Sequence, residues 1–164
     1  MTRKVMVTGA AGYIGRHVVA ALLDQGSEVV AVVRPGSAPE TFEGCEVRTH
    51  DVIAEPEPPA DFFEGIDAGL HLAWRDGFVL ASPNHPRDLS AHYRFLTGAA
   101  SNGVATIAGV GTMHEIGYWE GAISADTPSK PQNLYGVAKA ALRDSLALTF
   151  DKSETVFQWL RCYY

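Results

Sequence analysis

The sequence predicts an α/β protein built on a doubly wound parallel sheet, with helices on both faces in three layers. Apolar runs suited to buried strands alternate with segments of helical periodicity along most of the chain. The first apolar run, at residues 5–7, leads directly into the glycine-rich segment 8–15 and then into a helical pattern. Strand, glycine turn and helix in this order are typical of the first unit of such a sheet.

The individual elements follow from periodicity and from turn residues. Strands are expected at residues 4–8, 28–33, 46–49, 68–73, 104–110 and 155–160. Helices are expected at residues 13–25, 60–64, 87–102 and 133–150, with Asn133 as a cap. The proline-rich segment 54–59 is expected to be a surface loop, because proline has no N–H to donate. We interpret residues 1–164 as one domain.

The composition is that of a soluble globular protein, with 46% hydrophobic and 20% charged residues. The net charge of −6 and the lack of a basic patch argue against a nucleic-acid partner. No apolar stretch is long enough to cross a bilayer and no signal peptide precedes the first strand, so we expect a cytoplasmic protein with no membrane partner. Cys45 and Cys162 lack metal-ligand spacing, so we expect reduced thiols and no metal site.

The glycine-rich turn after the first strand is a candidate binding site for a dinucleotide. Gly9 allows a tight turn, Gly12 lets backbone N–H groups approach a pyrophosphate, and Gly15 allows close packing of helix on strand. The helix N-terminus adds unpaired donors and the positive end of its dipole. The alternative interpretation is a structural turn without a ligand.

Three further residues could carry chemistry. Tyr135 and Lys139 lie four positions apart, on one face of the last predicted helix. A nearby ammonium favours the phenolate form of a tyrosine and lowers its pKa, and it could also reach a cofactor ribose. Thr112, just past the fifth predicted strand, could hydrogen-bond a substrate oxygen. The plainer alternatives are ordinary helix neighbours for the first pair and a turn or cap threonine for Thr112.

Taken together, these motifs resemble the nucleotide-binding part of an extended short-chain dehydrogenase/reductase, in the NAD(P)-dependent sugar-nucleotide epimerase/dehydratase family. The resemblance covers nearly the whole chain in the family's order. Its matching segments are Thr-Gly-x-x-Gly-x-x-Gly at 8–15, Asp51-Val52, His71-Leu72-Ala73-Trp74, Thr112, Tyr135-x-x-x-Lys139 and Leu160-Arg161.

The resemblance implies a Rossmann-like fold and a role for each matching residue. Hydride would pass between nicotinamide and a sugar carbon while Tyr135 moves the hydroxyl proton. Lys139 would lower the pKa of Tyr135 and hold the ribose, and Thr112 would bind the reacting oxygen. The implied cofactor contacts are Gly9, Gly12, Tyr13, Ile14 and Gly15 at the pyrophosphate, Asp51 and Val52 at the adenine, and Leu72, Ala73 and Trp74 near the nicotinamide.

Several positions depart from the family pattern. Arg34 replaces the acidic residue that accepts the adenine ribose hydroxyls in NAD-preferring members, which favours NADP over NAD. Met113 and His114 replace the Asp-Glu pair of the dehydratases, which argues against dehydratase chemistry, and Glu115 is one position off as a substitute. Trp74 stands where a small residue is common, and it could narrow the substrate mouth or belong to the core.

The resemblance also implies partners and a longer protein. The expected substrate is a nucleotide-sugar, and a homodimer would form through the helices at 87–102 and 133–150. The C-terminal substrate domain of such enzymes has no counterpart here, so the chain is expected to be the nucleotide-binding portion of a longer enzyme. The alternative function is a non-catalytic NADP-binding redox sensor, although a sensor would not need all three residues Thr112, Tyr135 and Lys139.

Overall fold

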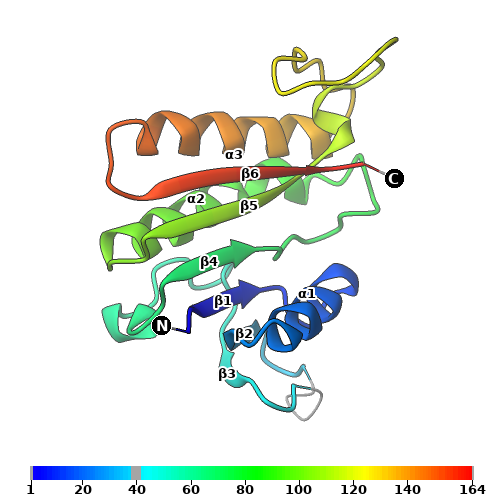
Figure 1. Ribbon diagram of the computed structural model, residues 1–164. Coiled ribbons are helices and arrows are strands. Elements are labelled where there is room, and N and C mark those ends of the chain that lie inside the picture. The colour runs from blue at the N-terminus through cyan, green and yellow to red at the C-terminus, as the bar shows by residue number, and fades with distance from the viewer. Residues whose placement is uncertain (1, 38–41, 164) are drawn as a thin grey trace.

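The computed structural model describes residues 2–37 and 42–163. One sheet contains all six strands in the order β3-β2-β1-β4-β5-β6, and every pairing is parallel (Figure 1). The strands are β1 (Lys4–Thr8), β2 (Glu28–Val33), β3 (Glu46–Thr49), β4 (Ala68–His71), β5 (Thr106–Thr112) and β6 (Val156–Cys162). The helices are α1 (Tyr13–Asp24), α2 (Asn84–Ser101) and α3 (Leu134–Phe150), with single 3-10 turns η2 (Ala60–Phe63) and η3 (Met113–Glu115). The predicted doubly wound parallel sheet is confirmed.

Two apolar clusters lie on opposite faces of the sheet, as parallel strands buried on both faces require. On β1 and β2, Met6 and Val30 join the cluster under α2 and α3, whereas Val7 and Val29 join the cluster under α1. Side chains alternate between the two faces along each strand, so one run of β-branched residues serves both clusters. Among the described residues, no helix is long and apolar enough to cross a membrane.

Several predicted boundaries need correction. The helix predicted at 87–102 begins three residues earlier, at Asn84, because Pro86 lies in the first turn, where a missing N–H costs nothing. The fifth strand begins and ends two residues later than predicted, and the sixth extends to Cys162. The fourth strand ends at His71 instead of residue 73.

The early end of β4 has a local cause that matters for the site. The backbone N–H of Ala73 donates to the hydroxyl of Thr8 at 3.2 Å, whereas the N–H of Leu72 donates to the carbonyl of Thr8. The chain therefore leaves the sheet and turns toward the glycine loop that follows β1. This is the point where the strand order reverses, since β2 lies on one side of β1 and β4 on the other.

Candidate functional site

Two connected clefts open at the carboxyl ends of the strands, on either side of this reversal point. The first, of about 320 Å³, extends toward β2 and β3 and is lined by Arg34, Asp51 and Val52. The second, of about 500 Å³, extends toward β5 and α3 and is lined by Thr112, Tyr135 and Lys139. Both clefts share the residues Gly9, Gly12, Leu72 and Trp74. A ligand with two ends joined by a narrow middle fits this shape.

The glycine loop leaves no room for side chains where the clefts meet. Gly9 has a φ of +69°, and a Cβ there would lie 2.7 Å from the backbone nitrogen of Ala73. A Cβ on Gly15 would overlap the carbonyl oxygen of Gly9. The loop thus packs tightly against the segment just past β4 and against its own helix, as the sequence predicts for a turn that brings backbone N–H groups close to a phosphate.

The β2–β3 end of the first cleft combines a cation with a fixed carboxylate. Arg34 is exposed at the end of β2. The carboxylate of Asp51 accepts hydrogen bonds from the backbone N–H groups of Ile53 (2.9 Å) and Ala54 (3.2 Å). Burial opposes ionisation of Asp51, but these donors and the positive charge of Arg34 outweigh it, and the pKa of Asp51 is lowered.

Lys139 is the most constrained charged group in the second cleft. Its side chain is buried, and its ammonium donates to the carbonyl of Val110 at 2.7 Å. The nitrogen also lies 3.9 Å from the centroid of the Trp74 ring, a cation–π contact, and 6.0 Å from the centroid of the Tyr135 ring. Burial lowers the pKa of Lys139 from 10.5 to about 7, although the charges of Glu115 and Cys162 partly oppose this shift.

Thr112 and Tyr135 line the same cleft from two elements. Thr112 ends β5, and its hydroxyl accepts from the N–H of His114 at 3.3 Å, so the predicted cap role is real. This contact occupies one lone pair and leaves the hydroxyl proton for another partner. Tyr135 lies in the first turn of α3, with its ring centroid 5.2 Å from that of His85. The structure therefore brings together all three residues predicted to carry chemistry.

Trp74 packs against the core and also lines both clefts. Its indole stacks on the ring of His92, with centroids 4.4 Å apart, and its N–H donates to Nδ1 of His85 at 3.1 Å. The imidazole of His92 is in turn linked to His71 (2.9 Å), which is bonded to the hydroxyl of Thr8 (2.8 Å). Burial lowers the pKa values of both histidines, as expected for core residues.

Glu115 does not reach the cleft that holds Tyr135. Its carboxylate is fully buried and bonded to Trp159 of β6 and Arg143 of α3, within the protein interior. It is therefore not placed to protonate a leaving group on a substrate in that cleft. This geometry agrees with the argument against dehydratase chemistry from Met113 and His114.

Sequence reasoning missed several residues that line the clefts. They come from the segments just past β2, β3 and β4, from β5 and from β6: Ser37, His50, Ile53, Arg75, Asp76, Gly77, Phe78, Val79, Val110, Gly111 and Cys162. The one sequence feature that could have identified them is their position after predicted strands, because loops at the carboxyl ends of parallel strands surround the ligand in such sheets. Phe78 is 92% exposed on this rim, which is unusual for an aromatic side chain without a ligand to cover.

Residues 5–163 match the family described as the NAD dependent epimerase/dehydratase family. The chain belongs to this family. It is 42% identical over 166 aligned positions to a dTDP-6-deoxy-L-talose 4-dehydrogenase (NAD(+)) of Aggregatibacter actinomycetemcomitans, a match that covers 98% of this chain and 60% of that protein. It is 27% identical to an uncharacterised UDP-glucose epimerase of Bacillus subtilis, over 83% of this chain and 48% of that protein.

Solved structures of family members share the fold. A UDP-glucose 4-epimerase of Stenotrophomonas maltophila, solved with NAD and formylated UDP-arabinopyranose, superposes with a TM-score of 0.84 at 23% identity. That match covers 97% of this chain and 52% of the other. The chain thus spans about half to three fifths of the length of the relatives it matches.

Proposed function

We propose that this chain is the cofactor-binding and proton-transfer part of an NAD(P)-dependent oxidoreductase or epimerase that acts on a nucleotide-activated sugar. The observation that carries the proposal is the pair of joined clefts, with a phosphate-type glycine loop between them and Thr112, Tyr135 and Lys139 in one of them. Family membership and the sugar-nucleotide activities in the relatives' names support the same reading.

The cofactor would extend across the reversal point of the sheet. Its pyrophosphate would lie at the loop formed by Gly9 and Gly12 and at the N-terminus of α1, where N–H groups and the helix dipole favour negative charge. Its adenosine end would lie by Asp51 and Val52, and its nicotinamide end by Trp74. The bound cofactor would supply the hydride acceptor or donor.

The chain's own residues would then handle the proton. Thr112 would donate a hydrogen bond to the reacting sugar oxygen and hold it near Tyr135. Tyr135 would take the proton from that hydroxyl as hydride leaves the carbon, and return it in the reverse direction. The charge of Lys139 stabilises the phenolate that this step requires.

Hydride transfer tests this proposal. The enzyme carrying this chain should oxidise NADH in the presence of a 4-keto nucleotide-sugar, followed by the loss of absorbance of the reduced nicotinamide. Tyr135→Phe should lower the rate by roughly 100-fold or more, while NADH affinity stays within about twofold, because only the proton donor is removed. An unchanged rate would exclude Tyr135 as the acid/base. Cofactor binding without any hydride transfer in the wild type would favour the redox-sensor alternative.

Cofactor preference is a second part of the proposal. Arg34 lies beside the adenosine end and can pair with a 2′-phosphate, which favours NADPH, whereas the relative from Aggregatibacter is named as NAD(+)-dependent. Replacement by alanine (Arg34→Ala) should weaken NADPH binding by roughly tenfold and leave NADH binding nearly unchanged. A wild-type protein that binds NADH at least as tightly as NADPH at equal salt would rule out the NADP preference.

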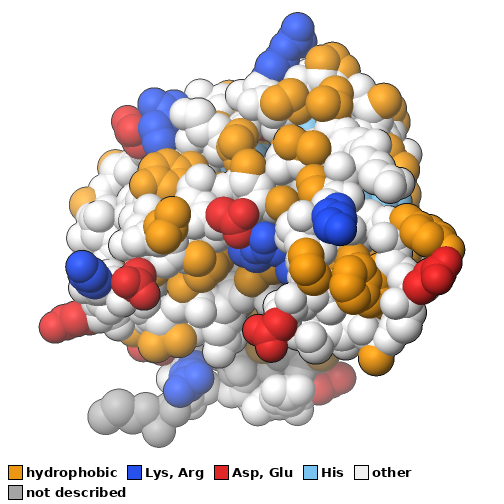
Figure 2. Space-filling view, turned by 90° about the horizontal axis from the view of Figure 1, so that it is seen from above, with side chains coloured by type: hydrophobic (Ala, Val, Ile, Leu, Met, Phe, Trp, Pro, Cys, Tyr) orange, Lys and Arg blue, Asp and Glu red, His pale blue; other side chains and the backbone are white. Residues whose placement is uncertain are grey.

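A homodimer through α2 and α3 is also proposed. Leu134, Val137 and Leu148 follow one another at spacings of three and eleven residues, which places them along one side of α3, and they are 40%, 46% and 81% exposed. Seen from above, the molecule shows orange apolar side chains in patches among charged ones (Figure 2). These exposed apolar side chains, with the exposed polar residues Asp144 and Ser145 between Val137 and Leu148, would be partly covered in a dimer through this side of α3.

A further inference from the structure

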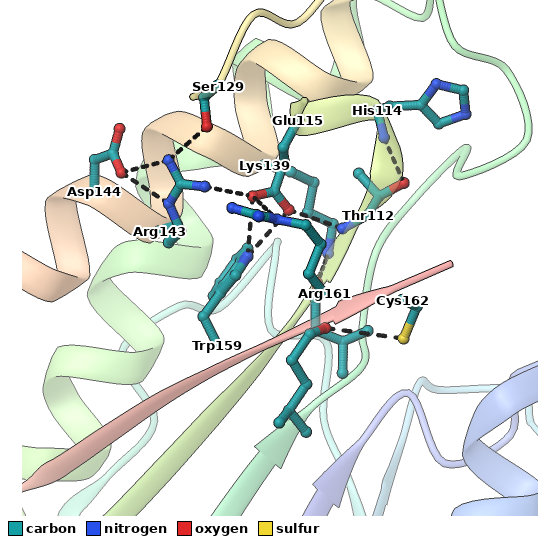
Figure 3. Close-up of polar contacts among 12 residues, drawn as sticks. Thr112, His114, Glu115, Ser129, Lys139, Arg143, Asp144, Trp159, Arg161 and Cys162 are labelled. Carbon is teal, nitrogen blue, oxygen red and sulfur yellow. Dashed lines mark hydrogen bonds and ion pairs between the residues drawn. The ribbon is translucent and has the colours of Figure 1, made fainter. Parts of the chain in front are cut away.

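Glu115 is a fully buried carboxylate that sits beside the candidate site without lining it. It is 0% exposed, at the end of η3. Removing a carboxylate from water costs several kcal/mol unless donors replace the water. Its donors come from three separate elements (Figure 3): the N–H of Thr112 (2.8 Å), the indole N–H of Trp159 (3.0 Å) and Nη1 of Arg143 (2.9 Å). Nε of Arg161 lies at ion-pair distance, 3.5 Å away, without a hydrogen bond.

The backbone of β5 is shaped to make this arrangement possible. A Cβ on Gly111 would overlap both the carboxylate of Glu115 and the indole nitrogen of Trp159. A Cβ on Gly109 would lie 2.5 Å from the Trp159 ring. The two glycines therefore leave the space in which Glu115 and Trp159 meet. Burial of the Glu115 carboxylate is unfavourable in free energy, and two strand glycines leave the space for it. These observations indicate a role for Glu115 beyond packing.

The contacts of Glu115 connect it to both elements that carry the proposed chemistry, β5 and α3. Its bond to the N–H of Thr112 fixes the end of β5, next to the hydroxyl proposed to bind substrate. Its pair with Arg143 fixes α3 one turn after Lys139. The strand β5 also supplies the carbonyl of Val110 that holds the Lys139 ammonium.

We propose that Glu115 is a positioning residue that holds Thr112 and α3 in register and, through its charge, favours the ammonium form of the buried Lys139. This inference rests on the proposed function, because it assigns Glu115 to the support of that same site. In this role Glu115 touches neither substrate nor cofactor. The carboxylate acts through the strand end, through the helix and through its charge.

Several titratable or charged groups surround Lys139. These groups are Glu115 on η3, Tyr135 and Arg143 on α3, Arg161 and Cys162 on β6, His71 on β4 and His92 on α2. The buried histidines have lowered pKa values and stay neutral near pH 7, and the arginines oppose a charge on Lys139. Glu115 is therefore the main group that favours the charged lysine, against the cost of burial.

The test is a pH titration of the lysine side chains by NMR in the cofactor-free chain, with Glu115→Gln as the variant. The chain has four lysines, and Lys139 is the only buried one among those described. Its signal is the one that disappears in Lys139→Met. Glu115→Gln should lower the titration midpoint of Lys139 by roughly one pH unit. The charged fraction at pH 7 would then fall from about a half to about a tenth.

Asp144→Asn is the matched control. Asp144 pairs with the same Arg143 at 2.8 Å but is 63% exposed, so removing its charge should move the Lys139 midpoint by less than about 0.2 pH unit. A folded Glu115→Gln protein with an unchanged Lys139 midpoint would overturn the inference. So would an equal shift in Asp144→Asn.

A second variant keeps the inference testable if Glu115→Gln does not fold. Arg143→Gln removes the cation closest to Glu115, so the negative charge of the Glu115 carboxylate is less neutralised. The titration midpoint of Lys139 should therefore move to higher pH. A midpoint that stays or falls would contradict the role assigned to Glu115. None of these titrations involves cofactor or substrate, so a failure of the proposed function would show separately, as absent NADH binding or hydride transfer with the Lys139 titration intact.

Discussion

At the scale of single residues, Lys139 is where the fold exerts most control over chemistry. Burial brings the pKa of its ammonium down to about 7, and a carbonyl and an indole face hold the ammonium in place. A lysine of this kind is partly neutral at physiological pH, so its charge depends on what binds beside it. An anionic cofactor or a phenolate in the cleft would draw it to the charged form.

The lowered pKa of Lys139 makes a prediction about stability. An unfolded lysine keeps its proton up to about pH 10.4, whereas the folded one loses it near 7. The folded state is destabilised while Lys139 is charged. The free energy of unfolding should therefore increase by about 1–2 kcal/mol as the pH rises from 7 toward 9. The free energy of unfolding in urea, measured at several pH values, checks this, with Lys139→Met as the control in which the rise disappears. A free energy of unfolding that does not change with pH in the wild type would contradict the lowered pKa of Lys139.

At the scale of elements, the sequence predicted type and order better than ends. The bounds of β1, β2 and β3 are as predicted, because runs of β-branched residues stop at clear turn signals. The end of β4 was missed because the hydroxyl of Thr8, 65 residues away, draws the chain out of the sheet. The ends of β5 and β6 depend on their pairing with each other over seven residues, which no local pattern shows.

The N-terminus of α3 was predicted correctly and can be tested directly. The side chain of Asn133 accepts from the N–H of Gly136 at 2.8 Å, as a helix cap does. Asn133→Ala should lower the free energy of unfolding by about 1 kcal/mol, whereas Asn133→Ser or Asp should cost less. Denaturant unfolding of the three variants measures this. Equal losses in all three would mean that the cap bond contributes nothing.

The proposed dimer makes its prediction on the exposed side of α3. Leu148→Glu should convert a dimer into a monomer, because it places a charge in an apolar interface. The fold of the chain should stay intact, because Leu148 is 81% exposed in the monomer. Sedimentation equilibrium measures the change, and Ser145→Glu, one turn earlier, tests how far the interface extends. A wild-type chain that is monomeric at high concentration would rule out this interface.

At the scale of the whole molecule, the site is a consequence of the sheet order. The reversal between β1 and β4 opens a crevice, and every residue predicted to bind cofactor or carry chemistry lies along it. Motif residues could be found from sequence because they follow predicted strands or, for Tyr135 and Lys139, lie four positions apart on one predicted helix. The donors that surround Glu115 could not, because they come from three elements far apart in the chain and meet only through tertiary packing.

If the two clefts hold one NAD-type dinucleotide across the glycine loop, amide NMR during a titration with NADH will reveal it. Saturable shifts are expected, confined to the loop at Gly9–Gly15, the ends of β2 to β5 and the start of α3, with both clefts affected at one affinity. Shifts in only one cleft, shifts elsewhere on the molecule, or none at millimolar NADH would contradict it.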